Sequence, residues 1–124
     1  MTGTMLLLIL ASVGLGAVAQ VLMKLGMTAA AMREALATGA ATPVVLAVLT
    51  SPGVMGGLAL YGIATVLWLG VLSRVDLSQA FPFVGLSFVL AAVLGYFVFA
   101  EAVSAMRVAG IALIVAGVVL VGRG

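Results

Sequence analysis

The sequence contains no cysteine and no histidine, and charged residues make up only 6% of its 124 positions. Without cysteine there are no disulfides and no thiol chemistry, and without either residue the usual zinc ligands are missing. The commonest general base is missing as well. No Ser-His-Asp set, no pair of carboxylates within an apolar run and no glycine-rich phosphate loop occurs. We therefore predict that the protein is not an enzyme and that it holds no cofactor or metal.

The sequence is rich in apolar residues, which make up 66% of the chain. Its mean hydropathy is +1.49. A water-soluble domain needs more polar surface than this composition supplies, so the chain is predicted to be an integral membrane protein. The net charge of +2 is too small and too scattered along the chain to indicate nucleic-acid binding.

The apolar residues form four runs, and the first 23 residues carry no charge before Lys24. A helix needs about 20 apolar residues to cross a bilayer. We predict an all-α protein with one four-helix transmembrane domain over residues 1–124. Its spans are expected at about 4–24, 53–72, 79–100 and 104–122. The apolar run at 43–49 is too short to span, and it is interpreted either as a short interfacial helix or as the start of a long, tilted second span. The segment Ala17-Val18-Ala19 resembles a signal-peptide cleavage site, but no basic residue precedes the run, so we expect a span.

Several polar residues mark where these helices begin. Ser51 before Pro52 and Ser104 before the last run are suitable N-caps. Asp76 and Gln79 have the spacing of a capping box. The connections between the last three spans are short, which predicts antiparallel neighbours. The basic residues divide almost evenly between the two sides, so the orientation in the membrane stays open.

Lys24 and Gln20 lie four residues apart and therefore share a helix face. One interpretation is a lysine that snorkels to the interface and a glutamine that joins two helices. The other is a cation and an amide that face an inward cavity and bind an anionic headgroup. Glu101 has the same two interpretations, as an interfacial carboxylate near a helix N-terminus or as a substrate-binding group.

The third and fourth spans contain further candidates. Pro82 predicts a kink in the third span or a break that faces substrate, and Ser87 follows it. The aromatic residues Tyr61, Trp68 and Tyr96 are interpreted as interfacial or packing residues. Gly110 and Gly117 lie seven residues apart, which leaves one face of the last helix open to close packing, either within the protomer or in a dimer.

The stretch from Gly110 to Val118 resembles the association motif in the fourth helix of small multidrug resistance transporters. The whole chain is similar to four-helix members of the drug/metabolite transporter (EamA-like) superfamily, which implies a half unit that works as a dimer. In the resemblance Gly110, Leu113, Ile114 and Gly117 form the dimer contact. Two features differ from the multidrug exporters. Gly16 stands where they carry an essential glutamate, and Phe81 and Val84 stand where they carry tyrosine and tryptophan.

A further resemblance is to the subunits of the flippase for aminoarabinose linked to undecaprenyl phosphate. It is carried by residues 17–20 with Lys24, by residues 66–69 and 80–88, and by residues 101–104 and 110–122. It implies a subunit in the bacterial inner membrane that moves a polyprenyl-phosphate-linked sugar, as a homodimer or as a heterodimer with a similar subunit. Lys24, Gln20, Glu101, Pro82 and Ser87 would then contact substrate.

Two other functions remain open from the residues. One is an antiparallel homodimeric exporter of a small polar metabolite or organic cation, in which Glu101 would have to supply the negative charge. The other is a helper that docks or folds another membrane protein without transporting anything. The resemblance favours the lipid flippase.

Overall fold

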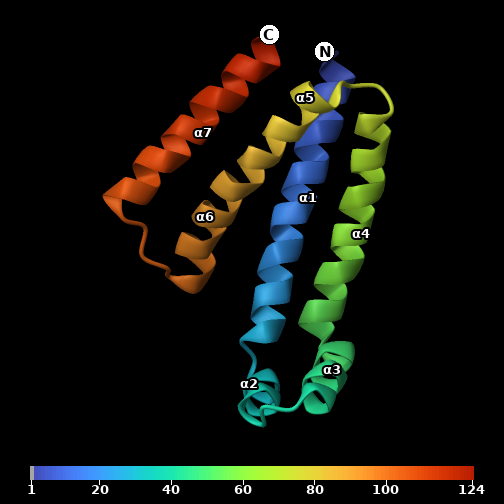
Figure 1. Cartoon of the computed structure of the whole chain (residues 1–124), viewed down its shortest axis with the longest axis vertical. Coiled ribbons are helices and arrows are strands. Elements are labelled where there is room, and N and C mark those ends of the chain that lie inside the picture. The colour runs from blue at the N-terminus through green and yellow to red at the C-terminus, as the bar shows by residue number, and fades with distance from the viewer. Residues whose placement is uncertain (1) are drawn as a thin grey trace.

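The computed structural model describes residues 2–124, which are helical with short connections and contain no β-strand. The helices are α1 (Gly3–Met27), α2 (Ala30–Ala37), α3 (Ala41–Thr50), α4 (Pro52–Leu72), α5 (Leu77–Ala80), the 3-10 helix η1 (Phe81–Val84), α6 (Gly85–Phe99) and α7 (Ala105–Arg123). Four stretches are long and apolar enough to span a membrane: α1, α4, the continuous stretch from α5 to α6, and α7. The prediction of an all-α membrane protein with four spans is confirmed. Both termini lie at one end, with α2 and α3 at the other (Figure 1).

Helices α1 and α4 form the most closely packed pair, and glycine makes their close approach possible. A methyl group on Gly57 would lie 2.6 Å from Met23 Cγ and 2.8 Å from the carbonyl oxygen of Ala19. Gly53 is in similar contact with the backbone of Gly26. Small residues are common where membrane helices pack. In lipid the hydrophobic effect does not favour association of helices, so van der Waals contact at short distance has to stabilise the pair. The pair therefore forms a rigid wall on which the site is built.

The third span is not one continuous α-helix. Pro82 has no N–H to donate and lies in η1, between the single turn of α5 and the longer α6. The predicted capping box before this span is wrong. The Asp76 side chain makes no capping hydrogen bond, and the backbone carbonyl of Asp76 accepts from the N–H of Gln79 instead. Asp76 is exposed beyond the end of the span, where water can solvate its carboxylate.

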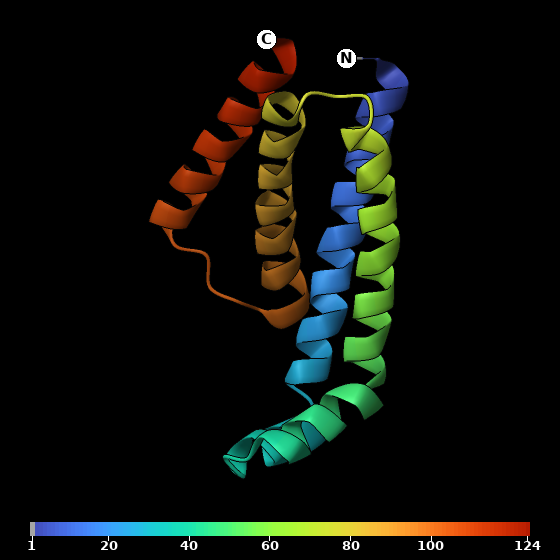
Figure 2. The same cartoon turned by 45° about the vertical axis from the view of Figure 1, so that its right-hand side comes forward.

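The buried core lies toward the end that holds the termini. Its residues come from all four spans and the turn after α4: Met5, Ile9, Val13, Val71, Val75, Ala80, Phe83 and Val118. Helix α7 is attached here, since a methyl group on Gly122 would meet the ring of Phe83 and one on Gly85 would meet Ile114. Away from this contact, α7 diverges from α6 (Figure 2). Helix α7 therefore packs against the other spans near this end of the bundle.

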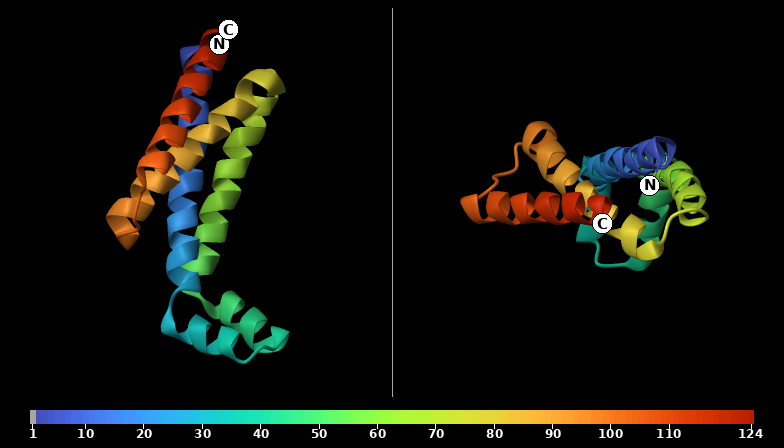
Figure 3. Two further views of the ribbon diagram at one scale, coloured as in Figure 1. Left: turned by 60° about the vertical axis from the view of Figure 1, so that its left-hand side comes forward. Right: turned by 90° about the horizontal axis from the view of Figure 1, so that it is seen from above.

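Residues 28–50, where one short helix is expected, contain two short helices. Helix α2 buries Met32 and Ala35, whereas α3 buries none of its residues. Gly39 connects them with a φ of 70°, a left-handed conformation that suits glycine. The two helices form a hairpin that lies at an angle to the long axis of the spans (Figure 3).

Candidate functional site

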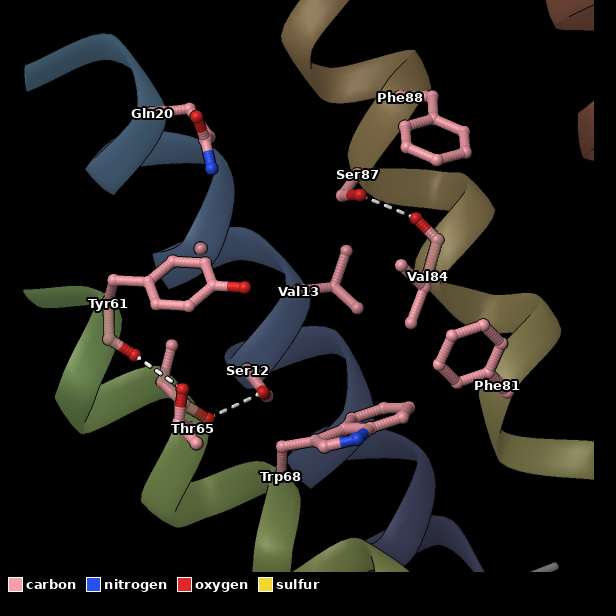
Figure 4. Close-up of a pocket in the computed structure, with 12 residues that line it drawn as sticks. Ser12, Val13, Gln20, Tyr61, Thr65, Trp68, Phe81, Val84, Ser87 and Phe88 are labelled. Atoms are coloured by element: carbon pink, nitrogen blue, oxygen red, sulfur yellow. Dashed lines mark hydrogen bonds between the residues drawn. The ribbon is translucent and has the colours of Figure 1, made fainter. Parts of the chain in front are cut away.

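Two cavities share Gln20 in their walls, and the larger of these two lies between α1, α4 and the third span with a volume of about 360 Å³. Tyr61 and Trp68 line it from α4, and Phe81 and Phe88 line it from the third span. The remaining lining residues are Ser12, Val13, Gly16, Gln20, Ala64, Thr65, Val84 and Ser87. Figure 4 shows the two sets of aromatic side chains on opposite sides of the space. A cavity of this volume lies within the usual range for small-ligand sites, about 300–1,000 Å³.

Three hydroxyl groups in this cavity donate hydrogen bonds to backbone carbonyl oxygens. The Ser12 hydroxyl donates to the carbonyl of Ala64 at 2.8 Å, which joins α1 to α4. The hydroxyls of Thr65 and Ser87 donate to carbonyls of their own helices. Within residues 2–124, the amide of Gln20 and the hydroxyl of Tyr61 make no side-chain hydrogen bond, and Figure 4 shows the Tyr61 hydroxyl directed into the cavity. These two groups are available to a ligand.

A second cavity of about 240 Å³ lies next to the first, between α1 and α6. Gln20 lines both cavities. Lys24 and Glu101 line the second one and form an ion pair across 77 residues of sequence. The Lys24 ammonium also lies 4.8 Å from the centroid of the Phe99 ring, a cation–π contact. With 48% and 41% of their side chains exposed, Lys24 and Glu101 are accessible from outside the protomer.

The backbone around Glu101 directs its carboxylate toward α1. Ala100 adopts the left-handed conformation with φ 53°, and the N–H of Glu101 donates to the carbonyl of Gly95 at 3.2 Å. A methyl group on Gly95 would lie 2.6 Å from Oε2 of Glu101, so the carboxylate occupies the space that a side chain at position 95 would fill. Left-handed alanine costs about 1 kcal/mol, and the turn therefore holds Glu101 in place against a local preference.

The cavity-lining residues of α1 include a series spaced four positions apart: Ser12, Gly16, Gln20 and Lys24. Gly16 stands where the multidrug exporters carry their glutamate, and a methyl group there would meet no atom within 4 Å. The larger cavity therefore has no carboxylate in its wall, and the glycine leaves it wider. The negative charge of the site lies at its end, on Glu101.

The structure brings some of the candidate residues together and separates others. Gln20, Lys24 and Glu101 share the second cavity, and Ser87 lines the larger one. Pro82 lines a different, shallow hollow.

The candidate dimer residues on α7 divide between two faces. Gly110, Leu113 and Gly117 are exposed, and methyl groups on the two glycines would meet nothing within 4 Å. Ile114 instead packs against the core of its own protomer.

The aromatic walls of the cavity were missed by sequence reasoning. Tyr61 and Trp68, interpreted from the sequence as interfacial or packing residues, also line the larger cavity, and Trp68 packs against the core as well. Tyr96 does pack, edge to face, on Phe97. The available signal was spacing. Tyr61, Thr65 and Trp68 stand at positions i, i+4 and i+7 of one helix and so share a face.

Four spans around an open groove with a charged pair at its end define a small multi-pass protein of the bacterial inner membrane. The chain is 40% identical over 123 residues to a "probable 4-amino-4-deoxy-L-arabinose-phosphoundecaprenol flippase subunit ArnE" of Pseudomonas paraeruginosa, covering 99% of this chain and 98% of that protein. It belongs to the ArnE family of flippase subunits.

Two other proteins of the same name support the assignment. The protein from Pseudomonas savastanoi is 43% identical over 65% of this chain and 71% of its own length. The one from Pseudomonas aeruginosa strain UCBPP-PA14 is 44% identical over 60% of this chain and 65% of its own length. No family model and no solved structure matches the chain.

Proposed function

We propose that this protein is a subunit of a flippase that moves 4-amino-4-deoxy-L-arabinose-phosphoundecaprenol across the bacterial inner membrane. Family membership over nearly the full chain supports the substrate. The observation that carries the proposal at the site is the groove formed by the two cavities, with Lys24 and Gln20 along one wall. A lysine ammonium suits a phosphate, and the glutamine amide can donate to headgroup oxygens.

The dimensions and lining of the groove also favour a lipid-linked sugar. Apolar faces of Trp68 and Phe88 offer flat surfaces for a sugar ring in the larger cavity. The groove is open at the side of the protomer, so an undecaprenyl chain could remain in the lipid while its headgroup enters. A fully enclosed cavity would not accept such a tail.

Transport rather than catalysis is the activity we propose. Residues 2–124 contain no group of side chains that could hold a metal ion, and the ionisable residues of the groove are Lys24, Glu101 and the phenol of Tyr61. Moving a polar headgroup through lipid requires a desolvated binding site rather than a nucleophile. The relatives are named as flippase subunits, which agrees with this.

We further propose that the four-helix unit works as a dimer, with a second copy or a related subunit, as in EamA-like half units. The outer face of α7 carries an exposed seam at Met106, Gly110, Leu113, Gly117 and Leu120, spaced alternately by four and three residues. This spacing keeps one face toward a partner helix, and the glycines permit close backbone contact.

The alternative, an exporter of organic cations, needs a carboxylate that is free to bind a cation. Glu101 is the carboxylate that lines the groove, and it is already paired with Lys24. Gly16 leaves the centre of the groove without one. Proton-driven uptake of a quaternary ammonium dye into proteoliposomes, well above the rate in empty vesicles, would contradict the proposal and support this alternative.

The direct test is a flux assay with reconstituted protein and the aminoarabinose lipid. Lys24→Gln should abolish flux without loss of folded protein. Lys24→Arg should retain part of the activity, because arginine keeps the charge and binds phosphate. Gln20→Ala should have a milder defect. Arg33→Gln on α2, an exposed cation outside both cavities, is the matched control and should transport normally. Normal flux by Lys24→Gln would show that Lys24 is only an interfacial anchor.

A further inference from the structure

We propose that the Lys24–Glu101 ion pair is the resting form of a site for a zwitterionic headgroup. When substrate binds, the two side chains separate, Lys24 pairs with the phosphate and Glu101 pairs with the ammonium group of the sugar. The inference rests on the proposed function, because the lipid in question carries one phosphate and one amine. It adds a role for Glu101, which becomes the residue that selects an aminated sugar.

Charge balance is the first argument. Lys24–Glu101 is the only ion pair among residues 2–124, and it lies at the end of the groove beside the Phe99 ring. If the phosphate alone took Lys24, Glu101 would be left next to the substrate without a counter-charge. Leaving a carboxylate unpaired beside a bound headgroup that displaces its water is costly. A headgroup with both charges exchanges partners and leaves every charge compensated.

The backbone provides the second argument, because it holds Glu101 inside the groove. A carboxylate at a membrane boundary is better solvated when it extends into water than when it lies against a helix. Here the left-handed Ala100 turns the chain back, and Gly95 leaves the space that the carboxylate fills. An exposed surface ion pair needs neither feature. The arrangement suits a carboxylate that must remain within reach of a ligand.

The third argument is that the groove places neutral groups between the charges and the aromatic cavity. Gln20 lines both cavities, so a headgroup bound at the ion pair would lie next to the cavity that Trp68 and Phe88 line. In the substrate, one sugar ring separates the amine from the phosphate. The long side chain of Lys24 can move away from Glu101 by the width of such a ring.

The test compares two lipids on the same protein sample. The full chain is purified from membranes with any subunit that accompanies it. It is titrated with two short-chain polyprenyl phosphates, one carrying aminoarabinose and the other N-acetylated aminoarabinose, in which the nitrogen has no charge. The single tryptophan, Trp68, lines the groove and reports binding by its fluorescence. We expect the amino lipid to bind about tenfold more tightly, as one charge-assisted hydrogen bond would give.

Glu101→Gln should change this preference in a way that a structural role would not. The amino lipid should bind more weakly, and the N-acetylated lipid more tightly, because Lys24 no longer has an internal competitor. The ratio of the two affinities does not depend on the fraction of folded protein, so partial misfolding cannot imitate the result. Glu34→Gln on α2, whose carboxylate is exposed and outside both cavities, should keep the wild-type ratio.

Other outcomes separate this inference from the proposed function. If the wild type binds both lipids equally, or if Glu101→Gln keeps the wild-type ratio, the exchange of partners is wrong, and the flux assay with the aminoarabinose lipid decides the proposed function separately. If neither lipid binds or is transported by the wild type, the proposed function fails and the inference fails with it.

Discussion

Replacing Gly57 with alanine should loosen the contact between α1 and α4. The added methyl group would lie 2.6 Å from Met23 Cγ and 2.8 Å from the Ala19 carbonyl oxygen. Carbon atoms in good contact are about 3.5–4.0 Å apart, so the helices must separate by about 1 Å. The side chain of Met23 can move, but the backbone of Ala19 can move only with its helix. Overpacking of this kind costs about 1–3 kcal/mol.

The helix propensity of alanine opposes this cost, since alanine is favoured over glycine within a helix by about 1 kcal/mol. Gly62→Ala on the same helix is the matched control, because a methyl group there meets nothing within 4 Å. The control should gain from propensity alone. We therefore expect the two variants to differ in their free energy of unfolding by about 1–3 kcal/mol, with Gly57→Ala the less stable.

The measurement is reversible unfolding in mixed detergent micelles, followed by the fluorescence of Trp68. Both substitutions lie on α4, the helix that carries this tryptophan, so the same probe serves both variants. Equal stability of Gly57→Ala and Gly62→Ala would refute the close contact of α1 and α4 and, with it, the rigid wall of the groove.

Gly95→Ala should lower flux of the aminoarabinose lipid without a large loss of stability, because the flexible Glu101 carboxylate can move away from the new methyl group; unchanged flux would argue against a role for its position. Ala100→Gly should raise the free energy of unfolding by up to about 1 kcal/mol by relieving the left-handed conformation, whereas Ala102→Gly should lower it slightly. Gly117→Leu should weaken dimerisation by at most a few kcal/mol, as crosslinking and sizing in detergent would show; an unchanged dimer would mean that this face is not the interface.

The fold class could be predicted from the sequence because it depends on hydropathy summed over local stretches. Four apolar runs separated by polar residues require four spanning helices, whatever their packing. The shared face of Gln20 and Lys24 was also predictable, since helical periodicity alone places residues four apart together. The N-cap hydrogen bond, in which the Arg107 N–H donates to the Ser104 hydroxyl oxygen, is local in the same way.

The assembly of the site was decided by tertiary structure. The spans are apolar on all sides, so their sequences do not reveal which face turns inward, and lipid does not distinguish one apolar face from another. Helix rotation therefore decided that Trp68 lines a cavity and that Ile114 packs within its own protomer. The pairing of Lys24 with Glu101 joins residues far apart in sequence, and it depends on the left-handed turn after α6 and on the close packing of α1 with its neighbours. No local pattern specifies such a contact, because it exists only once the helices are packed.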